Sequence, residues 1–193
     1  MIQLSRPACP HPIALNNKNY KHPRNKSALE SSTSGKCMYC ESKTSHINFG
    51  HVEHLKPKAA GFFPQLEFEW TNLGYVCDRC NNAKGSKYFP GVEFINPYDE
   101  NPANEIQPYG SLLFARGASE RGELTINEIG LNRPELVEQR NMRIKAVHTA
   151  LVAALRATNP AVRMSAIEEL KKEAWPDKEF SLAISGLLGS LLP

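Results

Sequence analysis

The chain has 193 residues, which is enough for one domain or two small ones. Hydrophobic residues make up 41% and charged residues 22%, a composition that supports a packed core and excludes a wholly disordered chain. No apolar run approaches the roughly 20 residues of a membrane-spanning helix, and the N-terminal MIQLSRPACPHP lacks the apolar stretch of a secretory signal. The sequence therefore predicts a cytoplasmic protein without a membrane partner, whose five cysteines stay reduced.

The net charge of +3 is unevenly distributed along the chain. Residues 1–60 carry nine Lys/Arg against three Asp/Glu, whereas residues 61–133 carry six against ten and residues 134–193 eight against seven. A basic N-terminal third is typical of a segment that contacts nucleic-acid phosphates, but it is equally typical of a solvated arm. Charge alone does not decide between these two interpretations.

The first half of the chain divides by composition. Residues 1–34 contain scattered prolines and an Asn/Lys cluster with weak periodicity, which predicts an N-terminal arm with one short helix near 27–31. Residues 35–90 hold the paired cysteines and form the predicted core. Residues 91–131 resemble short strands broken by turns, including a strand over 111–117, and are predicted to be a β-rich extension.

A C-terminal helical region is predicted over residues 132–193. The run NRPE at 132–135 combines a capping residue, a first-turn proline and an acid, and so indicates a helix start. Asn-Pro at 159–160 opens a second helix. A third, weaker helix follows Asp177. The apolar, uncharged segment 180–192 suggests a second hypothesis, that this end is a surface for a partner protein.

Two C-x-x-C pairs, Cys37 with Cys40 and Cys77 with Cys80, are separated by 36 residues. Zinc prefers tetrahedral thiolate coordination, and each pair presents two sulfurs to one ion. The spacing predicts a structural four-thiolate zinc site, which is closed because no position is left for water. A redox role is disfavoured because no βαβ pattern surrounds the pairs. Cys9 has no partner at metal-binding spacing and is expected to be a spare thiol.

Polar residues suited to catalysis lie between and beside these pairs. Adjacent Glu53 and His54 fall on a short predicted strand in GHVEHLKPK, which the proline ends. Asn72 follows in EWTNL, and Asn81 lies directly after the second pair. The last segment is expected to run into a short helix that Gly85 ends.

At this point the sequence resembles a known family. The order C-x-x-C, EHLxPK, NL and C-x-x-CNxxKG is similar to the ββα-metal motif of HNH endonucleases. A wider likeness, carried by YCE at 39–41, VEHLKPK at 52–58, INPY at 95–98 and TINEIGLNR at 125–133, is to the HNH subunit of Septu-type and retron-associated anti-phage systems. The resemblance implies an α+β fold: a ββα-metal HNH core with a structural four-cysteine zinc site, a small β insertion and a C-terminal helical region.

The resemblance also implies roles for individual residues. His54 would be the general base, and Glu53 and Asn81 would be the ligands of one catalytic Mg²⁺ or Mn²⁺. Asn72 would tether the loop that carries the histidine. Asn81 replaces the last histidine of the motif, as in the HNN branch, and this favours Mg²⁺ or Mn²⁺ over an imidazole-held transition metal.

Three lysines, Lys56, Lys58 and Lys84, are predicted to contact nucleic acid. The last lies three residues after Asn81, about one helical turn.

The predicted function is metal-dependent hydrolysis of phosphodiester bonds by an HNH endonuclease, with DNA as the expected substrate. The resemblance implies that it is the effector subunit of an anti-phage system that includes an ABC-type ATPase. Other functions stay open at this point. One is a ribonuclease that acts on structured RNA, and the others are a non-catalytic zinc module that binds nucleic acid and an adaptor that holds the ATPase.

Overall fold

The computed structural model describes residues 1–44 and 50–192. The N-terminal segment contains two helices, α1 (Pro12–Asn16) and α2 (Pro23–Ser32). The predicted short helix near 27–31 lies within α2, which is longer than expected, and α1 was not predicted. Each helix begins with proline at its first position, where the missing N–H has no intrahelical partner to lose. In the sequence, these prolines indicated an irregular chain, but in the structure they mark the starts of two helices.

These helices are packed against the rest of the protein. Asn25 is buried, and its amide accepts from the backbone N–H of His11 and donates to the carbonyl of the same residue. Leu15 and Leu29 belong to a hydrophobic cluster with apolar residues of the central hairpin. The arm is thus held to the hairpin by an apolar contact and is fixed internally by the Asn25 amide.

The central unit has the order strand, strand, helix. β1 (His51–His54) pairs antiparallel with β2 (Leu73–Val76), and α3 (Asp78–Lys84) follows at once. The connection between the strands contains the 3-10 helices η1 (Pro64–Leu66) and η2 (Trp70–Asn72). Cys77 caps α3 by accepting from the backbone N–H of Cys80, and Gly85, at φ +51°, ends the helix as the sequence predicts.

The next segment is only partly β-structured. A hairpin of β3 (Ile106–Tyr109) and β4 (Leu112–Ala115) is flanked by the 3-10 helices η3 (Pro102–Asn104) and η4 (Arg116–Ala118). The predicted β-rich character then fails, because α4 (Glu120–Ile129) follows. Its first turn is capped by the Ser119 hydroxyl, and Gly130 in the left-handed conformation ends it.

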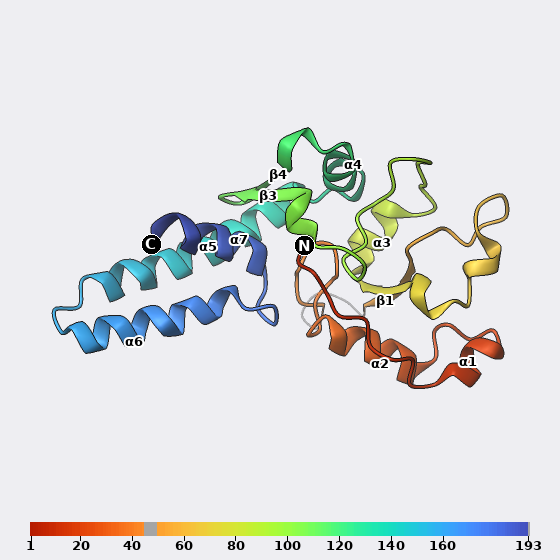
Figure 1. Ribbon diagram of the computed structural model, residues 1–193, viewed down its shortest axis with the longest axis horizontal. Coiled ribbons are helices and arrows are strands. Elements are labelled where there is room, and N and C mark those ends of the chain that lie inside the picture. Colours follow the sequence, from red (N-terminus) through yellow and green to blue (C-terminus); the bar gives the residue numbers. More distant parts are fainter. Residues whose placement is uncertain (45–49, 193) are drawn as a thin grey trace.

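The C-terminal region is helical, as predicted. It comprises α5 (Pro134–Leu155), α6 (Pro160–Lys171), the 3-10 helix η5 (Lys172–Ala174) and α7 (Ser181–Leu191). Figure 1 shows α5 and α6 as a helical hairpin at the end of the molecule remote from α1 and α2. No helix in the described part of the chain combines the length and apolar character needed to cross a bilayer.

The predicted helix starts in this region agree with the structure only in part. Asn159 caps α6 by accepting from the N–H groups of the next turn, as predicted. Asn132 is not the cap of α5, because its side chain accepts from and donates to the backbone of Leu113 on β4. The third helix starts at Ser181 and not near Asp177.

Helix α7 covers much of the apolar segment that suggested a partner surface. Ile184 and Leu188 are buried and pack with Val147 and Leu151 of α5. Gly186 lies against the ring of Pro108, where a Cβ would have no room. This segment therefore contributes to an intramolecular core.

The largest hydrophobic cluster surrounds the first cysteine pair. It includes Met38 and Tyr39 together with Ile129 of α4, Leu136 of α5 and Ala183 of α7. The cysteine pairs are thus embedded in the main core and are not an appended finger.

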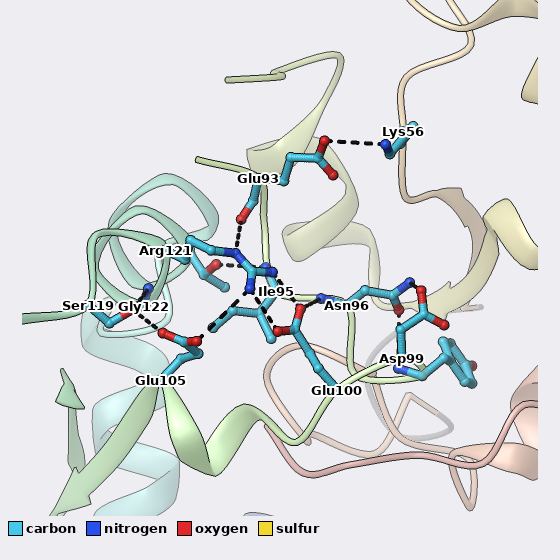
Figure 2. A network of polar contacts seen from close by, with 12 residues as sticks. Lys56, Glu93, Ile95, Asn96, Asp99, Glu100, Glu105, Ser119, Arg121 and Gly122 are labelled. Carbon is cyan, nitrogen blue, oxygen red and sulfur yellow. Dashed lines mark hydrogen bonds and ion pairs between the residues drawn. The ribbon is translucent and has the colours of Figure 1, made fainter. Parts of the chain in front are cut away.

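A polar network ties the loop after β1 to α4 (Figure 2). Lys56 Nζ lies 3.2 Å from Glu93 Oε1, and Arg121 Nε donates to the carbonyl of Glu93 at 3.0 Å. The Arg121 guanidinium also holds both carboxylate oxygens of Glu100, at 2.8 and 2.5 Å. A bidentate arginine–carboxylate pair fixes orientation as well as charge. Arg121 therefore anchors residues 93–100, and Lys56 links this segment to the loop that follows β1.

Candidate nuclease site

The four thiols of the C-x-x-C pairs converge. The sulfur atoms of Cys37, Cys40, Cys77 and Cys80 all lie within 4.8 Å of one another, and Cys40 Sγ lies 3.8 Å from Cys77 Sγ. Zinc–sulfur bonds of about 2.3 Å in a tetrahedron place neighbouring sulfurs about 3.8 Å apart. The donor set therefore fits a closed tetrahedral site for a thiophilic metal.

A cation stands beside this cluster. Arg133 NH1 lies 3.7 Å from Cys80 Sγ and also donates to the carbonyl of Gly130 at 3.1 Å. Four thiolates around a divalent ion carry excess negative charge, and a guanidinium at this distance offsets part of it. The residue comes from the start of α5, so the helical region contributes to the metal site.

A second site is a cavity of about 490 Å³ beside β1. Glu53 and His54 from the end of β1 and Asn81 from α3 line this cavity together. The proposed base and the proposed metal ligands thus face one space. Asn72 and Lys84 are absent from the lining that the described residues form.

His54 is held by its neighbours. Its Nε2 lies 2.9 Å from the carbonyl oxygen of Glu67, so in a neutral ring Nε2 carries the hydrogen and donates it, and Nδ1 keeps the lone pair. Burial lowers the pKa of His54 below its ordinary value, although the bond to the Glu67 carbonyl opposes this shift. The imidazole is therefore neutral near pH 7. The ring of Tyr20 packs edge-on against it, with centroids 4.6 Å apart.

Glu53 is almost fully buried and is paired with Lys84. Lys84 Nζ donates to Glu53 Oε1 at 2.6 Å and to the backbone carbonyl of His54 at 2.8 Å. Burial raises the pKa of Glu53, and the ammonium opposes the shift. Within the described chain no hydrogen bond engages Oε2, so this oxygen is available to a cation.

The position of Lys84 disagrees with the predicted contact to nucleic acid. Its side chain is 0% exposed, and its ammonium is turned toward β1 rather than toward solvent. The one-turn spacing from Asn81 fixes where the side chain leaves the helix but not where its long stem ends. In this conformation Lys84 is the counter-ion of Glu53.

Asn72 fixes the loop that follows His54. Its Oδ1 accepts from the backbone N–H of Lys56 at 2.8 Å, and its Nδ2 donates to the carbonyls of Lys56 and Leu66 at 3.0 and 3.1 Å. The side chain is buried and its hydrogen-bonding capacity is largely used. Such an amide stabilises loop geometry and leaves little capacity for substrate.

The other lysines and His51 lie nearer the surface. Lys58 lines the cavity, and its ammonium donates to Glu67 Oε1 and to the Tyr20 hydroxyl, both at 2.9 Å. Lys56 is paired with Glu93 away from this lining. His51 lines the cavity 3.5 Å from Asp78 Oδ1.

The sequence did not identify three aromatic or basic residues of the cavity lining: Tyr20, Lys21 and Lys26. They belong to the N-terminal segment, far from the motif. The available signal was the excess of basic residues in residues 1–60.

Comparison with known proteins agrees with this geometry. Residues 37–87 match the family model described as HNH endonuclease. The chain is 28% identical to the Septu protein PtuB of Bacillus thuringiensis over 97% of its own length and 82% of that protein. It is 30% identical to the Septu protein PtuB of Bacillus mycoides strain KBAB4, over 63% of this chain and 51% of the relative.

A third relative is named "Retron Vc95 putative HNH endonuclease", from Vibrio cholerae serotype O1 biovar El Tor. It is 30% identical over 63% of this chain and 62% of its own length. The resemblance to HNH endonucleases of Septu and retron type is confirmed. The chain contains an HNH endonuclease domain, in which the two cysteine pairs frame the ββα unit.

Proposed function

We propose that this chain is a metal-dependent endonuclease that hydrolyses phosphodiester bonds of DNA, as the effector of an anti-phage system that includes an ABC-type ATPase. The observation that carries the chemistry is the single cavity that Glu53, His54 and Asn81 share inside an HNH domain. The similarity to two Septu proteins and a retron protein supports the defence role.

His54 acts as general base in this proposal. With Nε2 donating to the Glu67 carbonyl, Nδ1 takes the proton from the water that attacks phosphorus. The bond to Glu67 fixes both the tautomer and the ring orientation, while Asn72 holds the following loop. A base that is neutral near pH 7 needs no prior deprotonation, which suits the burial of this ring.

Glu53 and Asn81 hold the catalytic cation. Glu53 Oε2 and the amide oxygen of Asn81 are hard oxygen donors, which Mg²⁺ and Mn²⁺ prefer. Such a cation, when bound, offsets the charge that develops on the phosphate and on the leaving oxygen. Lys84 keeps the Glu53 carboxylate in place by binding its other oxygen.

The four thiolates hold a structural Zn²⁺. They join residues 37–40 to residues 77–80, and α3 starts inside the second pair. Because α3 carries Asn81 and β1 carries His54, the metal fixes the elements that bring these side chains to one cavity.

Nicking of supercoiled plasmid in the presence of Mg²⁺ tests the enzymatic part. His54→Ala is expected to lose at least about 100-fold in rate, the usual contribution of a general base. The matched control is His148→Ala, which removes an exposed histidine on α5 and should nick like the parent chain. Undiminished nicking by His54→Ala would refute the proposed base.

The substrate and the partner need separate measurements. Faster cleavage of a tRNA than of duplex DNA by the same preparation would replace DNA with structured RNA as the substrate. Co-purification of the chain with the product of a neighbouring ATPase gene tests the partnership. Protection against phage that survives His54→Ala would favour an adaptor role instead.

A further inference from the structure

The cavity beside β1 is completed by residues outside the matched HNH domain. Tyr20, Lys21 and Lys26 line it together with Glu53 and His54. They precede the matched region, which begins at residue 37. Figure 1 shows α2 and α3 on either side of β1, so the α1–α2 connection and α2 supply one wall and α3 another.

This wall is strongly basic. Residues 18–26, KNYKHPRNK, carry four Lys/Arg and no Asp/Glu. Lys18, Lys21 and Arg24 are exposed and Lys26 is half-buried. Across the described residues, none of these four side chains forms an ion pair within the chain. Their charge is therefore available to an external anion.

The basic segment is also anchored, which a solvated arm is not. Buried Asn25, inside the segment, binds both backbone groups of His11, and Leu15 and Leu29 on either side of it pack into the cluster of the hairpin. A cation held in place loses less conformational freedom on binding than one on a mobile tail. The packing thus favours phosphate contact over a merely solvating role.

The segment also touches the proposed base. The Tyr20 ring packs on His54, and its hydroxyl accepts from Lys58 Nζ at 2.9 Å. Lys58 in turn pairs with the Glu67 carboxylate, while the Glu67 carbonyl binds His54 Nε2. These four residues form a closed set of contacts around the imidazole. The wall and the catalytic base are therefore mechanically connected.

We propose that residues 18–26 are the clamp for the phosphate backbone of duplex DNA, with Lys21 and Lys26 contacting phosphates beside the scissile bond and Tyr20 positioning His54. This inference rests on the proposed function, since it concerns the substrate of the same cavity. Lysine ammonium groups act as point charges on phosphates and read no base sequence, so the clamp contributes affinity and not specificity.

Binding of fluorescein-labelled duplex DNA by the full-length chain, without Mg²⁺ so that no cleavage occurs, tests the clamp. Anisotropy titrations between about 50 and 200 mM salt give the slope of log Kd against log salt. Each lost phosphate contact lowers that slope by about one, so Lys21→Ala/Lys26→Ala should lower it by about two. The matched control, Lys145→Ala/Lys171→Ala, removes the same charge from α5 and α6, and its slope should equal the parent's.

An unchanged slope in the clamp variant would overturn the inference, and equal losses in both double variants would reduce it to non-specific charge. If the double variant fails to fold, as judged by its melting curve, exposed Lys21→Ala alone decides, with an expected loss of about one. These readouts are independent of cleavage. A parent chain that binds DNA but never nicks plasmid would refute the proposed function and leave the clamp standing.

The role of Tyr20 has its own readout. Tyr20→Ala removes the ring from His54 and should lower kcat about tenfold or more while KM changes little, since positioning acts on the bound complex. Tyr20→Phe keeps the ring contact and should recover most of the rate. A rise in KM without a fall in kcat would show that Tyr20 only binds substrate.

Discussion

At the scale of single residues, the pairing of Glu53 with Lys84 governs the candidate cation site. The two side chains are 7% and 0% exposed, and their closest approach is 2.6 Å. Two charges inside a protein lose hydration that only good mutual geometry offsets. Removal of either partner leaves the other charge buried and uncompensated. The pair is therefore a structural element of the fold as well as part of the proposed cation site.

Lys84→Met is expected to destabilise the chain by about 3–5 kcal/mol, because Glu53 is then buried without its counter-ion. Glu53→Gln/Lys84→Met should regain part of that stability but not the nicking activity. Urea denaturation and the plasmid assay measure the two effects. If Lys84→Met instead stays stable and gives DNA binding with a shallower salt dependence, Lys84 is the phosphate contact that the sequence suggested.

The sequence predicts some site residues and misses others for a physical reason. Cysteine spacing and motif order single out Cys37 and His54 as candidates, because metal ligands and catalytic groups recur at fixed local intervals. Tyr20 and Lys21 escape this reasoning, since only tertiary packing of the N-terminal helices brings them to the cavity. The direction of Lys84 escapes it as well, because a long side chain has many rotamers.

At the scale of elements, long helices with clear starts are predictable, and short helices and mixed segments are not. The proline starts of α5 and α6 and the Asn159 cap identify those helices. Helix α4 is short, and its beta-branched residues Thr125, Ile126 and Ile129 suggest strand, yet they are buried on one helical face. Asn132 shows the same limit, since a bond to a neighbouring strand prevailed over local capping.

Helix α7 offers a matched pair of glycines. A Cβ at Gly186 would lie 2.6 Å from Cγ of Pro108, a rigid ring, so Gly186→Ala should destabilise the chain by about 1–3 kcal/mol. A Cβ at Gly189 would meet nothing within 4 Å, and Gly189→Ala should be neutral or stabilise by up to about 1 kcal/mol. Urea denaturation of both variants measures the difference. Equal stabilities would show that α7 does not pack closely on β3.

At the scale of the whole molecule, the thiolate cluster is a junction. Cys37 and Cys80 share one hydrophobic cluster with residues of α4, α5 and α7, and Arg133 reaches the same sulfurs from α5. A metal held by these thiolates would therefore stabilise both the HNH unit and the helical region. Loss of the metal should therefore lower the stability of α4, α5 and α7 as well as that of the β1–β2 hairpin.

Metal analysis of the purified chain is expected to give one zinc per molecule. Chelation should lower the melting temperature and abolish nicking, because the free energy of metal binding to the four thiolates contributes to the stability of the fold. Zinc should restore the melting temperature and, once Mg²⁺ is also added, the nicking, whereas Mg²⁺ alone should restore neither. A melting temperature that is unchanged after complete zinc removal would contradict a structural role for the site.

The packing of α1 and α2 on the hairpin bears on how the protein can be dissected. A fragment trimmed to residues 37–87 would lack Leu15 and Leu29, the partners that cover Val52, Leu73 and Tyr75. The apolar surface exposed by this truncation would drive self-association. The cavity beside β1 would also lose the basic wall formed by residues 18–26. A fragment of this chain that folds on its own is therefore expected to start upstream of residue 37, where the match to the HNH family begins.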